Sequence, residues 1–405
     1  MPLVEGEQPA LGRLAIYTHD YLSMSMTFIY RQLMRLSRWE PLVLAATTRN
    51  LDFFPYQDLT VHGPPRLARL RDAAQRRLLR RTPELSRGQR RVFRRSLVDA
   101  RAVLVHAHFG PSGMEILPVA RDLGIPLLVT FHGFDASSLL RHPWYVSGLR
   151  ELFDHAHVIA VSRAMSERLI ECGAAAERVH VLYIGVPLAM FPFVRRTPLV
   201  EKVRHGEVIS FLQVANFVEK KGHPYTVRAF QRLHAAYPGS RLVLAGDGPF
   251  RAHAEHLARE LDLGDSVQFL GKVDEDDVRR LMAGADVFVH HSVTADDGDQ
   301  EGIPTAIMEA MASGLPVIST FHAGISELVD DRVSGYLVEE RDVEEYCRRL
   351  IDVLADEGSM GRAGRDKVES QFNIDVQTQR LSALYREIGL ADQFAGAAAP
   401  GNGHE

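Results

Sequence analysis

Short continuous apolar runs alternate with amphipathic helical stretches along most of the 405 residues. Such runs predict strands buried on both faces and the stretches between them predict crossover helices, so parallel sheets covered on both sides are expected. In the first half, the predicted strands are residues 14–17, 41–45, 102–105, 127–130, 158–161 and 179–182, with a helix around residues 28–36.

The alternation breaks near residues 191–207, where two prolines and mixed charges stand without periodicity, and then restarts. The predicted strands of the second half are residues 209–214, 241–245, 267–270, 287–290, 317–320 and 335–338. This repetition predicts an α/β protein with two doubly wound, Rossmann-like domains facing each other across a cleft. We place these domains at residues 1–195 and 207–371, with a linker at about Arg195 to Gly206.

The end of the chain predicts a helix followed by a tail. Residues 372–390 carry apolar side chains at helical spacing, which predicts a helix that packs on a domain and could return to the first one. Residues 391–405 are mostly small and polar, so we expect this tail to be disordered.

Composition favours an ordinary globular enzyme, with 46% hydrophobic and 24% charged residues. Cys172 and Cys347 stand alone, without a CxxC pair, so neither a disulfide framework nor a zinc site is indicated. The first ten residues lack the basic and apolar regions of a signal peptide, and no window reaches the length of a membrane span. A cytoplasmic protein is therefore predicted.

The net charge of −5 hides a basic block. Between Arg66 and Arg101 there are thirteen arginines and three acids. A solvated helical face explains such a block as well as a patch for phospholipid headgroups does, and the second reading would place the protein at the inner face of a membrane. Nucleic acid is not expected, because aromatic residues are sparse there and no recognition motif accompanies the arginines.

In open parallel sheets, ligands bind beyond the carboxyl ends of the strands. In the first half this rule selects the loops at residues 18–27, 106–110 and 131–135. His132 is the candidate among eighteen histidines, because it follows a strand and Asp135 could fix its tautomer. Most histidines are structural or solvated, and His108 is more easily explained as a residue that packs a loop.

In the second half, Glu301 and Glu309 stand eight residues apart across a turn that opens a short apolar helix. Pro304 suits the first position of that helix. A helix N-terminus attracts phosphate, and acids bind hydroxyls, so a sugar nucleotide fits both. For an isolated pair, one capping and one solvated acid would be the simpler explanation.

Further polar loops end the neighbouring strands of this half. Lys220 and Lys221 suit a diphosphate, although surface lysines are usually only solvated. Gly246 and Gly248 form a GxG without the third glycine of a dinucleotide fingerprint, and Gly271 ends the next strand. His290 and His291 lack metal-ligand spacing, so no metal site is predicted.

These segments resemble the retaining GT-B glycosyltransferases of the fourth family. The matching stretches are VEKKGH at 218–223, AGDGP at 245–249, FLGKV at 269–273 and EGIPTAIMEAMASGLPVIST at 301–320. In the first half, SMTFI at 25–29, HAHFG at 106–110 and HGFD at 132–135 look like members that build extracellular or capsular polysaccharide.

The resemblance implies transfer of a sugar from a nucleoside diphosphate to an acceptor hydroxyl, with retention and without a metal or other cofactor. Glu309 would hold the ribose and Glu301 the donor sugar, Lys221 would neutralise the diphosphate, and His132 would contact the sugar near the reacting carbon. Backbone groups of Gly302, Ile303, Pro304 and Thr305 would assist. Asn216 stands where the family commonly has arginine, so either Lys220 substitutes or the diphosphate is held less firmly.

Two alternatives remain open at this stage. A nucleotide-sugar epimerase of the same architecture would need no acceptor. A non-catalytic nucleotide-sugar-binding protein would explain Asn216. The sequence identifies neither the nucleotide nor the sugar nor the acceptor, which could be a glycan, a lipid-linked sugar or a small molecule.

Overall fold

The computed structural model describes residues 10–23, 26–63 and 84–390. By internal contacts the chain divides into two compact units. The N-terminal unit comprises the chain up to Val161, then Ser166–Leu182 and the part from Asp375 onward, and the C-terminal unit comprises Ser162–Met165 and Tyr183–Ile374. The last helix therefore belongs to the N-terminal unit for most of its length. This division falls before the linker predicted at Arg195 to Gly206.

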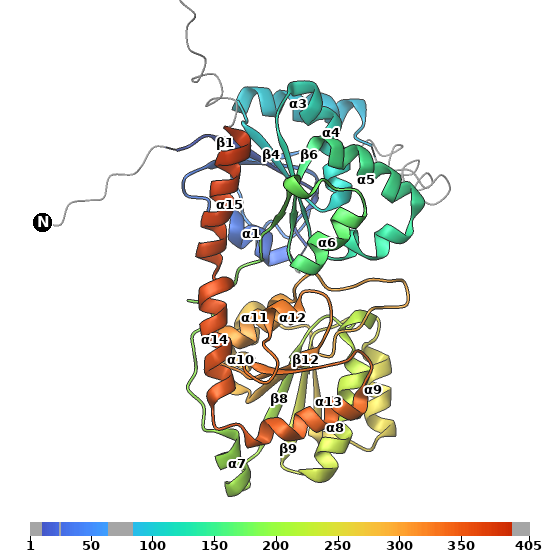
Figure 1. Ribbon diagram of the computed structural model, residues 1–405, viewed down its shortest axis with the longest axis vertical. Coiled ribbons are helices and arrows are strands. Elements are labelled where there is room, and N and C mark those ends of the chain that lie inside the picture. Colours follow the sequence, from blue (N-terminus) through green and yellow to red (C-terminus); the bar gives the residue numbers. More distant parts are fainter. Residues whose placement is uncertain (1–9, 24–25, 64–83, 391–405) are drawn as a thin grey trace, which may run out of the picture. The chain divides into compact units, whose positions relative to one another are not determined.

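The N-terminal unit is built on a seven-stranded parallel sheet in the order β3-β2-β1-β4-β5-β6-β7 (Figure 1). Its strands are β1 Arg13–Tyr21, β2 Glu40–Thr48, β3 Leu59–Val61, β4 Leu104–His108, β5 Leu127–Phe131, β6 Ala156–Ala160 and β7 Val179–Val181. Its helices are α1 Thr27–Leu33, α3 Arg87–Ala100, α4 Gly110–Leu123, α5 Pro143–His155, α6 Arg163–Glu171 and α15 Ile374–Gly389. The 3₁₀ turns are Phe134–Ala136, Ser138–Arg141 and Ala176–Arg178.

The C-terminal unit has a six-stranded parallel sheet in the order β10-β9-β8-β11-β12-β13. Its strands are β8 Ile209–Val214, β9 Ser240–Ala245, β10 Val267–Gly271, β11 Val287–Val289, β12 Val317–Thr320 and β13 Gly335–Val338. Its helices are α7 Leu199–His205, α8 His223–Ala236, α9 Arg251–Glu260, α10 Glu275–Gly284, α11 Thr305–Ala312, α12 Ile325–Leu328, α13 Val343–Asp352 and α14 Ser359–Gln371. The 3₁₀ turns are Glu219–Lys221 (η5), Gly264–Ser266 and Val353–Ala355.

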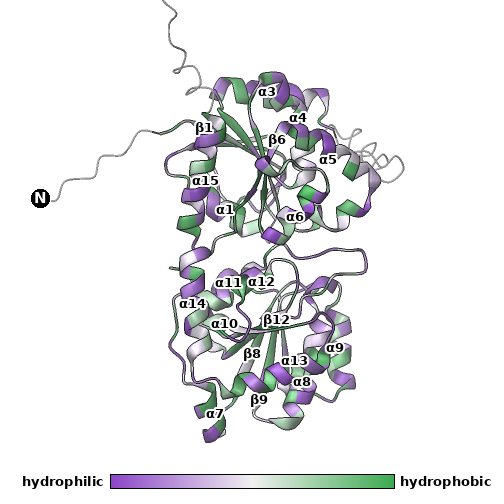
Figure 2. Cartoon of the chain, viewed as in Figure 1, coloured by the Kyte–Doolittle hydropathy of each residue, from purple (hydrophilic) through white to green (hydrophobic). Residues whose placement is uncertain are grey.

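These sheets confirm the predicted α/β class with two doubly wound halves, because in each sheet the strand order reverses at a central strand. Apolar runs make the strands, and Figure 2 shows them as hydrophobic between helices whose outer faces are hydrophilic. Strands β4 and β5 are buried at every position, as a sheet covered on both faces requires.

Three sequence expectations are corrected by the structure. Helix α7 lies inside the segment predicted to be an aperiodic linker. The sequence did not indicate this helix, because seven residues are too few to show a period. Strand β4 extends through His108, so His106 and His108 stand in the sheet rather than in a loop. Pro304 is the N-cap residue of α11 instead of its first helical residue. The tail predicted to be disordered, residues 391–405, lies outside the described residues.

Helix α15 completes the core of the N-terminal unit. Its apolar face, formed by Leu381, Leu384, Tyr385 and Ile388, packs in one cluster with β1, β2 and β4 side chains. The Tyr385 hydroxyl lies 2.6 Å from Nδ1 of His106, at the centre of the sheet. Helix α15 is therefore an integral part of this unit.

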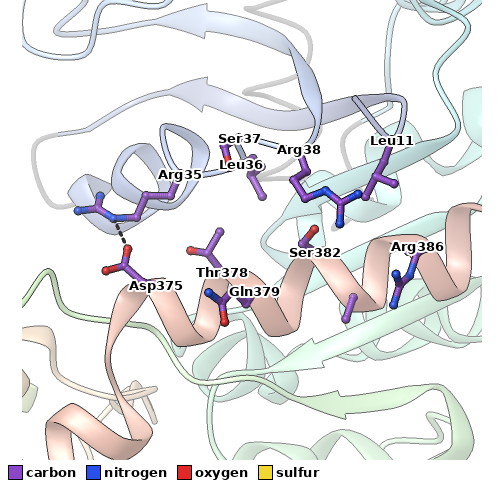
Figure 3. A pocket seen from close by; sticks show the side chains of 11 residues that line it. Leu11, Arg35, Leu36, Ser37, Arg38, Asp375, Thr378, Gln379, Ser382 and Arg386 are labelled. Atoms are coloured by element: carbon purple, nitrogen blue, oxygen red, sulfur yellow. Dashed lines mark hydrogen bonds and ion pairs between the residues drawn. The ribbon is translucent and has the colours of Figure 1, made fainter. Parts of the chain in front are cut away.

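A cavity of about 440 Å³ lies between α15 and the segment that links α1 to β2 (Figure 3). Arg35 Nε donates to Asp375 Oδ1 at 3.1 Å across it, and the nearby Trp39 indole donates to Ser382 Oγ at 2.8 Å. The residues lining this cavity include none of the predicted site residues, so the candidate site lies elsewhere.

Candidate active site

The candidate residues of the C-terminal unit gather at the carboxyl ends of its central strands. The loops there are fastened to one another by backbone hydrogen bonds: Ala215 N donates to Ala245 O at 3.0 Å, and Gly246 N donates to Gly271 O at 2.8 Å. A Cβ at Gly246 would lie 1.9 Å from the Ala215 oxygen, so only glycine permits this approach. Asn216 thus stands at the edge of this cluster of loops.

Lys221 and Glu301 form a buried ion pair at this edge. Lys221 Nζ lies 2.7 Å from Glu301 Oε1, and the two side chains are 17% and 8% exposed. The η5 turn that carries Lys221 is held by Gln213, whose side-chain amide donates to the Lys221 carbonyl at 2.8 Å. The turn ends at Gly222, with φ of +60°, where a Cβ would lie 1.7 Å from the His291 oxygen. The backbone position of Lys221, in the loop after β8, is therefore fixed.

The charge of Glu301 is sustained by its neighbours. Burial raises the pKa of Glu301, but the ammonium groups of Lys221 and Lys220 outweigh that effect and bring the pKa down to about 2. The carboxylate is thus ionised at neutral pH and can accept hydrogen bonds from hydroxyl groups. An incoming anion that attracts Lys221 would release that carboxylate for this purpose.

Lys220 is engaged in a different way. Its Nζ lies 2.9 Å from an Asp299 carboxylate oxygen and 3.2 Å from the Gln300 carbonyl. Lys220 therefore ties η5 to the segment that precedes Glu301. This contact positions the loop. It also engages the ammonium group that would have to bind the diphosphate if Lys220 substitutes for the arginine absent at Asn216.

Helix α11 follows Glu301 directly and carries Glu309. Gly302, Ile303 and Pro304 are buried, and they lead into Thr305 at the helix start. Glu309 is 9% exposed, in a helix whose other buried residues are apolar. The backbone N–H groups at the N-terminus of α11 therefore lie only a few residues after the buried carboxylate of Glu301.

His132 follows β5 in the N-terminal unit, but Asp135 does not orient its ring. The Asp135 carboxylate instead accepts backbone N–H groups of Gly110, His132 and Gly133 at 2.9–3.0 Å. The ring partner is His108, whose Nδ1 lies 3.1 Å from His132 Nε2. The expectation that Asp135 fixes the tautomer is therefore wrong, and the His132 ring contacts His108 instead.

The histidines here are neutral. Burial lowers the pKa of His108 to about 3, and burial together with the neighbouring His108 lowers the pKa of His132 well below its ordinary value. His132 Nδ1 is buried without a hydrogen-bond partner among the described residues. A neutral imidazole with one nitrogen held by His108 can donate or accept one hydrogen bond through the other.

Two groups escaped sequence reasoning. His322 accepts the backbone N–H of Glu301 at its Nε2, at 3.1 Å, from the loop after β12. In the N-terminal unit, Glu115 is buried and lies 2.8 Å from the Tyr17 hydroxyl and 2.9 Å from His19 Nδ1. These contacts join segments that are distant in the sequence, so no local sequence pattern indicates them.

Within the described ranges, no cluster of three or more histidine, cysteine or acidic side chains could hold a metal ion. His290 and His291 are buried, and His291 Nε2 accepts the Arg341 backbone N–H at 3.0 Å. No helix among residues 10–23, 26–63 and 84–390 is both long and apolar enough to cross a membrane.

Two parallel α/β units, with a buried lysine–glutamate pair and a helix N-terminus at the strand ends of one, define a doubly wound protein whose site suits a phosphate with attached hydroxyls. The chain belongs to glycosyltransferase family 4. The model of that family, described as "Glycosyltransferase Family 4", matches residues 27–189, and the one described as "Glycosyl transferases group 1" matches residues 199–368.

Relatives and solved structures agree with this assignment. The chain is 35% identical to WcaL of Escherichia coli, a protein named for colanic acid biosynthesis, over 71% of each chain. It is 32% identical to the amylovoran biosynthesis glycosyltransferase AmsK of Erwinia amylovora, over 69% of each chain. Anabaena Alr3699/HepE, solved in complex with UDP, is 18% identical with a TM-score of 0.73, covering 93% of this chain and 100% of that one. Sucrose-phosphate synthase from Thermosynechococcus elongatus is 20% identical with a TM-score of 0.71, over 95% and 100%.

Proposed function

We propose that this glycosyltransferase moves a sugar from a nucleoside-diphosphate sugar to an acceptor hydroxyl, with retention at the anomeric carbon. The observation that carries the proposal is the buried pair of Lys221 and Glu301 beside the N-terminus of α11. A cation and free N–H groups suit a diphosphate, and an ionised acid suits the hydroxyls of the attached sugar.

The chemistry follows from where charge develops. When the bond between the sugar and the phosphate breaks, the leaving diphosphate gains negative charge. Lys221 and the N–H groups that follow Gly302 would stabilise that charge without reorganising, which is commonly the largest catalytic contribution. Glu301 is assigned to binding and not to attack on the sugar. In this proposal the acceptor hydroxyl attacks from the face that the diphosphate leaves, and the diphosphate assists in removing the proton of that hydroxyl.

Further roles are proposed for residues around this pair. Glu309 would hold the ribose hydroxyls, and Gly246, Gly248 and Gly271 would let the nucleotide approach the backbone. His132 of the N-terminal unit would donate to or accept from the donor sugar as a neutral group. The reaction in this proposal needs no metal ion or organic cofactor, so a chelator such as EDTA should leave the rate unchanged.

The biological role we propose is assembly of an extracellular polysaccharide by a protein at the cytoplasmic face of a membrane. The relatives named for colanic acid and amylovoran biosynthesis support the polysaccharide part. Helix α3 supports the membrane part, because its outer face carries the exposed residues Arg87, Arg91, Arg94 and Arg95. Most of the remaining arginines of the basic block fall in residues 64–83, outside the described part of the chain.

A thermal-shift screen tests the donor proposal. UDP-, GDP-, ADP- and dTDP-sugars would be compared, because a ligand that binds only the folded state raises its melting temperature. UDP-glucose belongs in the screen because HepE has been solved with it. A stabilising donor should then be consumed only when an acceptor is present. Consumption without an acceptor, giving an epimeric sugar nucleotide, would contradict transfer.

The membrane proposal needs a separate test. Flotation with liposomes should increase with the fraction of anionic lipid and fall with added salt. Replacing the four exposed α3 arginines with glutamine should weaken flotation and leave donor binding unchanged. Flotation indifferent to lipid charge and to salt would contradict the proposal.

A further inference from the structure

The backbone of Glu301 is held by a side chain from another loop. Its N–H donates to His322 Nε2 at 3.1 Å, and His322 Nδ1 lies 2.6 Å from Glu340 Oε1. His322 follows β12 and its side chain is fully buried, whereas Glu340 follows β13. Glu301, His322 and Glu340 thus form a chain of hydrogen bonds from three segments distant in the sequence.

These distances fix the protonation of the imidazole. Nε2 must be the unprotonated nitrogen, because it accepts the N–H of Glu301, so the single ring proton stands on Nδ1 and is donated to Glu340. A ring with the proton on Nε2 would turn a donor toward the Glu301 N–H and lose both hydrogen bonds. The N–H of Glu301 and the carboxylate of Glu340 together select the form with the proton on Nδ1.

Glu340 has no spare capacity for a different arrangement. Its Oε2 accepts the backbone N–H of Thr294 at 2.7 Å and Arg341 Nη1 at 3.3 Å, and Oε1 accepts the Thr294 hydroxyl at 3.1 Å as well as the His322 proton. Burial raises the pKa of Glu340, but the hydrogen bonds from His322 and Thr294 outweigh it and bring the pKa to about 2. The segment from Thr294 to Glu301 is therefore held by this carboxylate directly at Thr294 and through His322 at Glu301.

We propose that His322 and Glu340 are positioning residues that keep Glu301 in place for the donor sugar. The inference rests on the proposed function, in which Glu301 binds the sugar and Lys221 binds the diphosphate. When the diphosphate attracts Lys221, Glu301 loses the ion pair with that lysine. The hydrogen bond to His322 acts on the backbone and persists, so the carboxylate stays where the sugar hydroxyls arrive.

Glu340→Gln is the decisive variant, because glutamine has the same shape and only one acceptor oxygen. If its NH₂ group took the place of Oε2, it would face the Thr294 N–H and the Arg341 guanidinium, which can only donate. If it faces His322 instead, the ring nitrogen can accept once the ring proton moves to Nε2, so this orientation is favoured and the contact from the ring to the Glu301 N–H fails. Glu339→Gln, at an exposed neighbouring acid, is the matched control.

The binding test compares each nucleoside diphosphate with its sugar nucleotide. The pairs UDP and UDP-glucose, GDP and GDP-mannose, ADP and ADP-glucose, and dTDP and dTDP-glucose serve as probes by calorimetry. In Glu340→Gln, the sugar nucleotide that the wild type binds should bind about tenfold or more weakly, consistent with one lost charge-assisted hydrogen bond, whereas its diphosphate should change less than about twofold. Equal weakening of both ligands, or no weakening of either, would overturn the proposal.

A second measurement needs no ligand and separates this inference from the proposed function. In protein carrying ¹⁵N-histidine, the ring signals lost in His322→Asn identify His322, and their shifts report which nitrogen holds the proton. We expect the Nδ1–H form in the wild type and a change in Glu340→Gln. An Nε2–H form or a charged ring in the wild type would refute the positioning role. If this form is found but none of the probes binds, the donor proposal fails and the hydrogen-bond chain stands.

Discussion

Lys221 Nζ and Glu301 Oε1 neutralise each other at 2.7 Å, and both side chains are more than four-fifths buried. The pair is the candidate donor site, and each charge also compensates for the burial of the other. A ligand can therefore bind both charges only if an anionic group replaces Glu301 beside Lys221 and hydroxyl groups replace Lys221 beside Glu301. This favours a ligand that carries an anion and hydroxyls together. The two functions of the pair can be separated by substitution.

Lys221→Met should destabilise the protein, because it leaves the Glu301 carboxylate buried without its cation. Breaking a buried pair costs about 3–5 kcal/mol. The double variant Lys221→Met with Glu301→Gln removes both charges and should recover most of that loss. Urea denaturation measures both values. Arg95→Ala, in an exposed pair, is the control and should be indistinguishable from wild type. A double variant no more stable than the single one would contradict this reading of the pair.

Glu309→Gln should reduce transfer with little effect on folding. The amide can accept one hydrogen bond from a ribose hydroxyl where the carboxylate could accept two, so we expect kcat/KM to fall about 10–100-fold, matching a loss of ~1.5–3 kcal/mol. Initial rates with the donor identified by thermal shift provide the measurement. Glu207→Gln, at an exposed acid, should keep the wild-type rate. Unchanged kcat/KM in Glu309→Gln would remove Glu309 from the site.

Asp135→Asn should destabilise the N-terminal unit. The buried carboxylate accepts three backbone N–H groups, and the asparagine amide would turn its own NH₂ toward at least one of them. An unsatisfied buried donor costs about 1–3 kcal/mol. The free energy of unfolding and the signals of the His132 ring should both change. Full stability would show that the loop reorganises without this anchor.

Stability should fall as the pH is lowered below about 6.5, the ordinary histidine value. Burial lowers the pKa of His108, His223 and His291 to about 3, so between pH 3 and 6.5 the unfolded chain binds more protons than the folded one. Unfolding is therefore favoured progressively through that window, with a slope of up to about 1.4 kcal/mol per pH unit for each such histidine. Melting temperatures from pH 8 to pH 5 test this, and a constant value across the range would contradict it.

The sequence pattern predicted twelve of the strands because each is a continuous apolar run, and the parallel sheets followed from the helices between them. It missed β3 because a strand of three residues, none of them fully buried, is too short to show a pattern. For the site, strand-end position and the family motif pointed to Lys221, Glu301 and Glu309. The partners that fix Glu301 could not be predicted in the same way, because His322 reaches Glu301, and Glu340 reaches His322, only after the crossovers from β11 to β12 and from β12 to β13 have formed.

The packing of α15 has a consequence for the order in which the protein is made. Leu381, Tyr385 and Ile388 belong to the core of the N-terminal unit, yet they are translated after the C-terminal unit. A ribosome must therefore synthesise the C-terminal unit before the core of the N-terminal unit can be completed. Until then, the apolar surface that awaits α15 is exposed to chaperones, and a nascent chain halted before residue 374 would leave it uncovered.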